Sequence, residues 1–263
     1  MAPAEPTLWQ LEISLYSEKA RWALAHKGVE HRRRSPLPGM HIAVALWLTR
    51  GKEKIFPVLQ LDGRTIGDST AIVAALEQRY PDPPLYPADP EQRRRALELE
   101  DFFDEELGPY TRLLPFHELI NEPEMFAEVA AAAVPGPLGR AKGLVGLYAR
   151  GYASLRFGAN SEAKAEVARE KIVAALDRLD AELAANGNGY LAGDRFSVAD
   201  LTAASLFYPL VNPEGGPLPP ETPSPPALER FREGLSERPG YIWVEEMFLR
   251  HRHPAKAAAG ASG

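Results

Sequence analysis

The stretch that decides the fold is FPVLQLDGRTIGDSTAI, which occupies residues 56–72. An apolar run, an Asp-Gly pair and a second run predict two antiparallel strands joined by a two-residue hairpin turn. Asp68 follows at the start of a helical pattern, and aspartate is a preferred helix N-cap. Pro57 cannot donate to a strand ladder, so it suits a first residue, an edge or a cis turn. A cis-proline loop beside a helix N-terminus would leave backbone groups free to bind a peptide-like ligand.

The upstream segments extend this hairpin into an α/β unit. The patterns predict a strand over 7–13, a helix over 14–27, a strand over 29–34 and a helix over 40–50. With the hairpin and a helix that ends at Tyr80, the order becomes βαβαββα. This is the thioredoxin-like arrangement, and it assigns residues 1–80 to one domain.

The rest of the chain predicts an all-helical domain. Five prolines between residues 81 and 90 predict a stiff linker. The domain then covers residues 91–250, with a disordered tail at 251–263. Its expected helices are a long one over 91–119, bent at Gly108-Pro109 and Pro115, and others over 124–133, 140–157, 161–185, 226–237 and 241–250.

Residues 196–201, FSVADL, predict a further helix start. Ser197 and Asp200 have the spacing of a capping box, and Phe196 could pack on Leu201 as a hydrophobic staple.

Composition excludes several classes of protein. A net charge of −6 argues against nucleic acid as a partner, because phosphate binding needs a concentrated basic surface. The absence of cysteine excludes disulfides and cysteine nucleophiles, so any thiol chemistry requires a bound thiol. No signal-peptide pattern and no long apolar run is present, so we expect a cytoplasmic protein without a membrane segment. No histidine spacing supports a metal site.

From Thr7 to about Arg250 the chain resembles the cytosolic glutathione S-transferases, in a serine-type, bacterial-like form. Residues 14–21, SLYSEKAR, resemble the SPxSxKxR opening of helix 1. Residues 56–58 with Asp68-Ser69 resemble the cis-proline loop and acidic-serine pair that hold glutathione. Residues 196–200 resemble the capping box of the helical domain. The segment 121–160 is longer than in many classes, and Leu15 and Phe56 depart from the motif's usual residues.

The resemblance implies an enzyme that activates glutathione as its thiolate. A free thiol has a pKa of roughly 8.5, and a helix N-terminus with a donating hydroxyl could lower it by about one to two units. Ser14, at the strand-to-helix junction, is the catalytic residue that the alignment favours, with Ser17 one turn further on as the alternative. Both serines could also be ordinary helix caps.

The resemblance also assigns the residues that bind glutathione. The backbone of Phe56, before Pro57, would pair with the cysteinyl unit. Asp68 would bind the γ-glutamyl ammonium, and Ser69 with the helix N-terminus would bind the carboxylate. Plain helix capping is the alternative for Asp68. For the glycyl carboxylate we prefer His41 to three other candidates, which are Arg50, Lys52 and Lys54.

A second-substrate pocket should lie between the domains. Its expected lining is aromatic, drawn from Tyr16, Tyr110, Phe116, His117, Tyr148 and Tyr152. The acidic residues Asp101, Asp104, Glu105 and Glu106 are read as solvated or as facing a second subunit.

The reaction expected by resemblance is attack of the glutathione thiolate on a hydrophobic electrophile. Conjugation, ether cleavage and dehalogenation all fit, and a homodimer is the expected assembly. Two alternatives stay open. One is a non-catalytic protein that binds glutathione or a hydrophobic ligand on the same fold. The other is an enzyme whose thiol is not glutathione.

Overall fold

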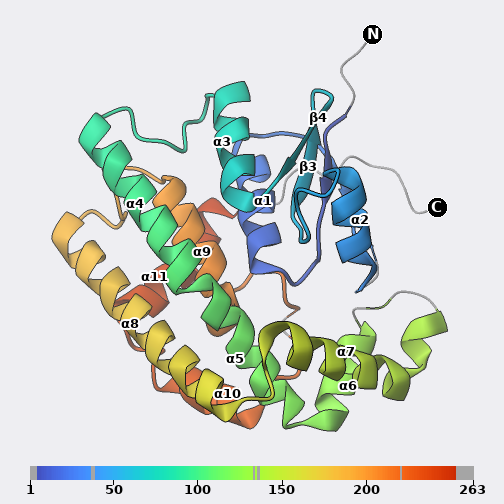
Figure 1. Ribbon diagram of the computed structural model, residues 1–263. Helices are drawn as coiled ribbons and strands as arrows, with labels where there is room; N and C mark the ends of the chain where they lie inside the picture. The colour runs from blue at the N-terminus through green and yellow to red at the C-terminus, as the bar shows by residue number, and fades with distance from the viewer. Residues whose placement is uncertain (1–4, 37–38, 133, 135–136, 220, 253–263) are drawn as a thin grey trace.

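The computed structural model describes residues 5–36, 39–132, 134, 137–219 and 221–252. A small α/β unit sits against a larger group of helices (Figure 1). The α/β unit consists of β1 (Thr7–Trp9), α1 (Leu15–His26), β2 (Arg32–Arg34), α2 (Met40–Leu48), β3 (Val58–Leu61), β4 (Arg64–Gly67) and α3 (Ser69–Arg79). Its order is the predicted βαβαββα, so the thioredoxin-like expectation is confirmed.

The sheet has the strand order β2-β1-β3-β4, in which β1 and β2 are parallel and the other neighbours antiparallel. The hairpin turn is the predicted Asp-Gly pair. Asp62 and Gly63 have φ values of 48° and 76°, the left-handed conformation that a type I′ turn requires at both positions. This turn sets the register in which Leu61 faces Arg64.

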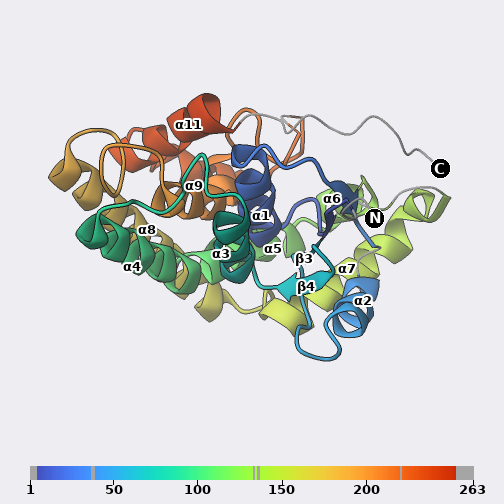
Figure 2. The same cartoon turned by 90° about the horizontal axis from the view of Figure 1, so that it is seen from above.

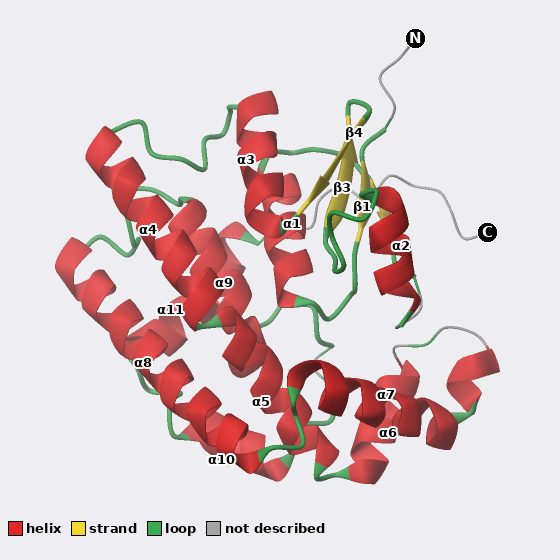
Figure 3. Ribbon diagram, viewed as in Figure 1, coloured by secondary structure: helices red, strands yellow, loops and turns green. Residues whose placement is uncertain are grey.

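The two faces of the sheet carry different layers (Figures 2 and 3). Helices α1 and α3 contact each other on the face that continues into the main hydrophobic core. Helix α2 covers the other face, where Ala45 packs with Phe56 and Val58 in a separate small cluster. The loop that carries Phe56 and Pro57 is therefore anchored by α2, whereas α1 is anchored by the helical domain.

The helical domain follows the proline-rich segment. It consists of α4 (Pro90–Glu106), α5 (Gly108–Ile120), α6 (Pro123–Ala132), a short 3-10 helix (Pro137–Arg140), α7 (Lys142–Phe157), α8 (Glu162–Asn186), α9 (Val198–Val211), α10 (Pro226–Glu233) and α11 (Pro239–His251). Helix α9 is buried along its whole length and contacts α1, α4, α5 and α11. The core of the helical domain thus continues directly into the α/β unit.

The prediction of one bent helix over 91–119 is wrong. Helix α4 ends at Glu106, and α5 begins at Gly108. Pro109 lacks the N–H that would continue the ladder, and its ring would clash with the carbonyl four residues earlier. A new ladder starts instead, with the N–H groups of Tyr110 and Thr111 both donating to Leu107 O. Pro115 lies inside α5 without ending it.

The proline-rich segment is fixed to the α/β unit. Glu77 of α3 accepts hydrogen bonds from the backbone N–H groups of Leu85 and Tyr86, at 3.0 and 3.2 Å. Lys27 pairs with the same carboxylate and donates to Pro83 O at 2.7 Å. These bonds therefore fix the proline-rich segment, which leads into the helical domain, against α1 and α3 of the α/β unit.

The predicted capping box is present at the start of α9. Asp200 is fully buried and accepts from Ser197 N at 2.8 Å, Ser197 Oγ at 2.7 Å and Leu191 N at 2.8 Å. Burial raises the pKa of Asp200 to about 6. The ring of Phe196 stacks on His251 and Trp22, so it ties the loop before α9 to α11 and α1.

We expect Asp200→Asn to lower the free energy of unfolding by about 2–3 kcal/mol. One carboxylate oxygen, which accepts hydrogen bonds, is replaced by an NH2 group that can only donate and that faces the N–H and O–H donors of Ser197 or Leu191. Chemical denaturation at neutral pH measures this loss. Asp194→Asn is the matched control, since Asp194 is exposed and pairs only with the exposed Arg195. An equal effect of the two substitutions would show that the capping box contributes little.

None of the helices in the described ranges is long and apolar enough to cross a membrane. The tail expected at 251–263 falls largely outside those ranges. His251 is the last residue of α11, and its carbonyl accepts a hydrogen bond from Trp22 Nε1 at 3.1 Å.

Candidate functional site

Ser14 is the N-cap of α1, at the predicted junction between the first strand and the first helix. Its Oγ accepts a hydrogen bond from Ser17 N at 3.3 Å, and the residue is partly exposed. The hydroxyl oxygen thus serves as a helix cap, and no described residue accepts a hydrogen bond from it. A capping serine can therefore still donate to a bound group.

The loop before Ser14 is held in place by side chains of α1 and α9. Strand β1 ends at Trp9, earlier than the predicted Ile13, and Arg21 holds the segment that follows in a loop. Arg21 donates to Gln10 Oε1 at 3.0 Å and to Glu12 O at 2.9 Å. The hydroxyl of Tyr208 donates to the carbonyl oxygen of Ile13. Sequence reasoning did not find these two supports.

Ser17 lies inside this support and not at the surface. It is fully buried, and its Oγ accepts a hydrogen bond from Leu11 N at 3.3 Å. The position therefore stabilises the loop that carries Ser14.

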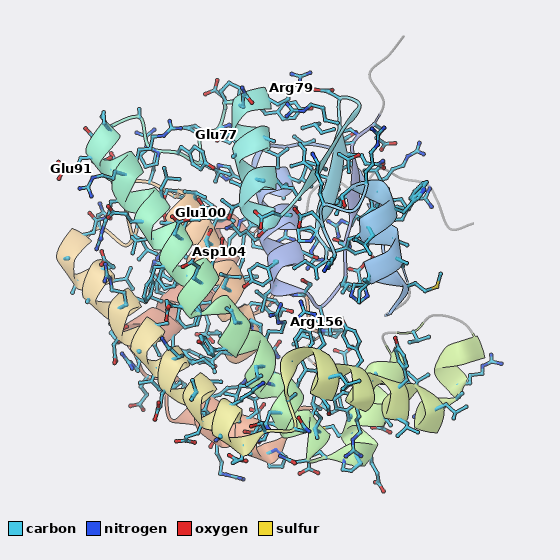
Figure 4. All side chains as sticks on the ribbon, viewed as in Figure 1. Glu77, Arg79, Glu91, Glu100, Asp104 and Arg156 are labelled. Atoms are coloured by element: carbon cyan, nitrogen blue, oxygen red, sulfur yellow. The ribbon has the colours of Figure 1, made fainter. Side chains whose placement is uncertain are left out.

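Lys19 forms a buried ionic cluster between the α/β unit and α4. Its Nζ lies 2.9 Å from Glu100 Oε1, 2.6 Å from Asp104 Oδ2 and 2.8 Å from Thr70 Oγ1. Figure 4 shows Glu100 and Asp104 on the side of α4 that faces this unit. Asp104 was expected to be solvated or to face a second subunit, and the first alternative is wrong, because Asp104 pairs with the buried Lys19. Burial raises the pKa of Glu100, and Lys19 opposes that rise.

The loop between α2 and β3 has the predicted form. The Phe56–Pro57 peptide bond is cis, and both residues are buried. Val58 directly follows and pairs with Trp9 of β1, so the loop lies beside the end of the strand that leads to Ser14.

Asp68 and Ser69 begin α3 at the same end of the sheet. Asp68 is exposed, and its Oδ1 accepts from Ala71 N at 3.0 Å. Its φ of 67° lies in a region that residues other than glycine rarely adopt. Such strain costs about 1–3 kcal/mol and is concentrated at functional sites. Ser69 is buried at the helix N-terminus.

His41 does not present a free ring nitrogen to this loop. Its Nδ1 accepts from Gly39 N at 3.1 Å, so the neutral ring carries its proton on Nε2, which lies 3.1 Å from the hydroxyl of Tyr152. Burial lowers the pKa of His41. The residue connects α2 to α7 and packs near the ring of Phe56.

An aromatic group lies between α1, α5 and α7, but its membership differs from the expected lining. Arg112 of α5 stacks on Tyr16 and Phe157, with its guanidinium carbon 5.8 and 4.7 Å from the ring centroids. Phe116 stacks on Phe157, and Tyr152 meets Phe157 edge-on. Arg112 was not anticipated, because a single arginine inside a helical pattern reads as a solvated residue.

Tyr110 and His117 are not brought into this aromatic group. Lys171 of α8 lies 5.9 Å from the ring centroid of Tyr110, which therefore faces α8. His117 is buried, with its two ring nitrogens 2.8 Å from Ala159 O and 3.1 Å from Glu162 Oε2. Both contacts stabilise the helical domain.

Two family descriptions match the chain on either side of α4. "Glutathione S-transferase, N-terminal domain" matches residues 8–84, and "Glutathione S-transferase, C-terminal domain" matches residues 129–239. The chain belongs to the glutathione S-transferase family. Together these matches cover the cis-proline loop, the α1 and α3 N-termini and the capping box of α9.

Curated relatives of the chain carry the name of one isomerase. A probable maleylacetoacetate isomerase of Caenorhabditis elegans is 25% identical over 250 residues, covering 92% of this chain and 94% of the relative. The maleylacetoacetate isomerase of Rattus norvegicus is 30% identical over 129 residues, which are 48% of this chain and 59% of that protein.

Solved structures of glutathione S-transferases share the fold. A holo maleyl pyruvate isomerase, described as a bacterial zeta-class glutathione S-transferase, has a TM-score of 0.62 at 21% identity, covering 97% of this chain and all of that chain (100%). A glutathione-bound theta-class enzyme of Xanthomonas axonopodis pv. citri has a TM-score of 0.55 at 23% identity, covering 90% of this chain and 95% of that one. Within the described ranges, no group of three or more metal-ligating side chains is present.

Proposed function

We propose that this family member binds glutathione between the Phe56–Pro57 loop and the N-terminus of α3, and activates its thiol at Ser14. The observation that carries the proposal is the position of the partly exposed Ser14 hydroxyl at the N-terminus of α1. Its oxygen accepts from Ser17 N, which leaves the hydroxyl proton for the sulfur. The positive end of the helix dipole favours the thiolate at the same place.

The neighbouring hydroxyls support Ser14 over its alternatives. Ser17 is fully buried and already bonded to Leu11 N. Tyr16 donates to the carbonyl oxygen of Asp104 at 3.1 Å, and burial raises its pKa to about 12. Neither hydroxyl is as well placed to meet an incoming thiol.

The proposed reaction is attack of the thiolate on an electrophilic carbon. A sulfur–carbon bond forms while the leaving group departs with its electron pair, and the thiol proton passes to water. A hydrophobic electrophile would meet the thiolate beside the aromatic residues Tyr16, Phe157 and Tyr152. We also propose a homodimer, which the family resemblance supports.

A second candidate reaction is glutathione-dependent isomerisation of maleylacetoacetate. The length of the match to the Caenorhabditis elegans relative supports it. Assays of purified protein with maleylacetoacetate and with an aryl halide, each with and without glutathione, separate isomerisation from conjugation. Glutathione binding without turnover of either substrate would favour a non-catalytic binding protein on this fold.

Replacing Asp68 with glycine tests the glutathione site. The exposed carboxylate would lose its charge-assisted bond to the γ-glutamyl ammonium, which is worth about 1.5–3 kcal/mol, so we expect the Kd for glutathione to rise about 10- to 100-fold. Stability should stay level or increase, because glycine relieves the strained φ of 67° and remains a fair N-cap. Calorimetric titration and thermal unfolding measure the two effects.

Asp62→Gly is the matched control. Asp62 is also an exposed aspartate at positive φ, but it lies in the hairpin turn and pairs with Arg79. This variant loses the same charge and should bind glutathione like the wild type. Equal affinity of Asp68→Gly and wild type would remove Asp68 from the site. Absence of glutathione binding by the wild type itself would indicate a different thiol.

A further inference from the structure

Arg112 is a cation that the described part of the chain leaves without a counter-charge. No hydrogen bond or ion pair joins its guanidinium to any described residue, and its Nε atom is buried without a partner. Burial lowers the pKa of this arginine, which means that its charge is held at a cost in the absence of an anion. A half-buried charge whose Nε atom has no partner requires an explanation.

Arg156 is an exposed second cation beside Arg112. It projects from α7 on the side that faces the α/β unit (Figure 4). Its guanidinium carbon lies 5.5 Å from the centroid of Phe157, the ring on which Arg112 also stacks. The positive charge of Arg156 adds to the effect of burial in lowering the pKa of Arg112 and the pKa of His41. Both cations therefore bear on the same space between α7 and the α/β unit.

Several other arginines of the helical domain pair with carboxylates. Arg169 pairs with Glu118, Glu162 and Glu166, and Arg238 pairs with Asp177 and Asp180. The chain carries 36 acidic and 30 basic residues, so carboxylates are abundant. Arg112 differs from these two arginines because it is half-buried without a carboxylate partner, and it shares the ring of Phe157 with Arg156.

The location of the pair is set by the first turn of α1. Tyr16 lies two residues after Ser14, and its side chain packs closely against Gly108 of α5. A Cβ atom at position 108 would lie only 2.4 Å from the Tyr16 hydroxyl oxygen. Arg112 is one turn further along α5 and stacks on the ring of Tyr16. Arg112 therefore lies against the first turn of α1, the helix whose N-cap is Ser14.

We propose that Arg112 and Arg156 form an anion site that binds a carboxylate of the second substrate, so that the protein prefers carboxylate-bearing electrophiles to neutral ones. The inference rests on the proposed function in requiring that a thiolate forms at Ser14.

The chemistry of arginine suits this role. Guanidinium presents a planar fork that matches a carboxylate with two parallel hydrogen bonds, and it remains charged when buried. Stacking on Tyr16 and Phe157 fixes the plane of Arg112 before the ligand arrives, so less side-chain entropy is lost on binding. Tyr152 and Phe157 supply an apolar wall for the rest of the molecule.

A pair of aryl chlorides that differ by one carboxylate tests the site. Both 2-chloro-1,3-dinitrobenzene and 4-chloro-3,5-dinitrobenzoate react with glutathione by forming a carbon–sulfur bond and releasing chloride. We expect Arg112→Gln to lower kcat/KM for the benzoate about 10- to 100-fold and to change that for the neutral chloride less than about threefold. Arg156→Gln, at an exposed position, should lower the benzoate value about three- to tenfold.

The KM for glutathione separates this proposal from its main competitor. It should stay unchanged in both variants, whereas a rise in either would assign the arginines to a carboxylate of glutathione and overturn the proposal. Equal losses for the two chlorides would also overturn it. Arg178→Gln is the matched control, because Arg178 also stacks on an aromatic ring, Phe102, but pairs with Glu182 on α8.

A binding measurement keeps the anion site testable if neither chloride is turned over. Calorimetric titration with 3,5-dinitrobenzoate and with neutral 1,3-dinitrobenzene then compares wild type with Arg112→Gln. Selective loss of benzoate binding would support the anion site while the transferase proposal fails. Equal binding of the two ligands by the wild type would overturn the site.

Discussion

Ser14→Gly is expected to return the pKa of bound glutathione toward its solution value of roughly 8.5. Each unit of that rise reduces the thiolate fraction at neutral pH by up to about tenfold, so kcat/KM at pH 7 should fall about 10- to 100-fold. Glycine is the informative replacement, because as an N-cap it costs only a few tenths of a kcal/mol relative to serine. The loss then reports the hydroxyl and not the helix cap.

The pH profile provides the specific readout for Ser14. The rate of the variant should rise with pH through the raised thiol pKa and approach the wild-type rate in alkaline solution. Titration of the thiolate absorbance in the complex measures the same pKa directly. A Ser14→Thr variant keeps the hydroxyl and should retain most activity. An unchanged thiol pKa in Ser14→Gly would exclude the hydroxyl as the activating group.

Lys19→Met should cause the largest loss of stability among single substitutions in the α/β unit. It leaves the carboxylate of Glu100 buried without its cation, and breaking a buried pair in this way costs about 3–5 kcal/mol. Chemical denaturation at pH 7 measures the loss. Lys171→Met is the matched control, because the partner of Lys171 is Glu106 and both side chains of that pair are about two-fifths exposed, at 41% and 44%.

The effect of Lys19→Met should depend on pH in a defined direction. Burial already raises the pKa of Glu100, and removal of Lys19 raises it further. Folded protein then binds a proton that unfolded protein, with a glutamate pKa of about 4.3, has released. The variant therefore keeps its stability below the unfolded pKa of about 4.3 and loses it as the pH rises through the raised pKa of folded Glu100. We expect the variant to be least destabilised in acid. A Lys19→Met, Glu100→Leu double variant should recover much of the loss and remove this dependence.

Local signals in the sequence predict the α/β unit well. The Asp-Gly pair specifies a type I′ turn because both positions need a positive φ, and the observed turn has it. A cis turn was one of three local alternatives for Pro57, and the family resemblance favoured it, whereas the cap at Asp68 follows from a rule that involves only neighbouring residues. The same kind of rule gave the box at Ser197 and Asp200.

Errors arose where distant contacts override a local pattern. The strand at the N-terminus stops at Trp9, and Arg21, nine positions after Glu12, holds the carbonyl oxygen of Glu12 in the loop that follows. Asp104 looked like a solvated acid because its partner Lys19 is 85 residues away in the sequence. The break between α4 and α5 was read as a bend because a Gly-Pro pair signals a disturbance without fixing its size.

The sequence alone determined the order of elements in the α/β unit, the hairpin, the starts of α1, α3 and α9, and the family, because each depends on short-range backbone chemistry or on ordered motifs. Tertiary structure decided what the polar residues of the SLYSEKAR motif do. Three of them, Ser17, Lys19 and Arg21, turn inward to fix a loop and an ionic cluster, which leaves Ser14 at the surface. Whether a charge is neutralised depends on which distant side chains fold against it, and for that reason only the structure could reveal that Arg112 stands unpaired within the described ranges.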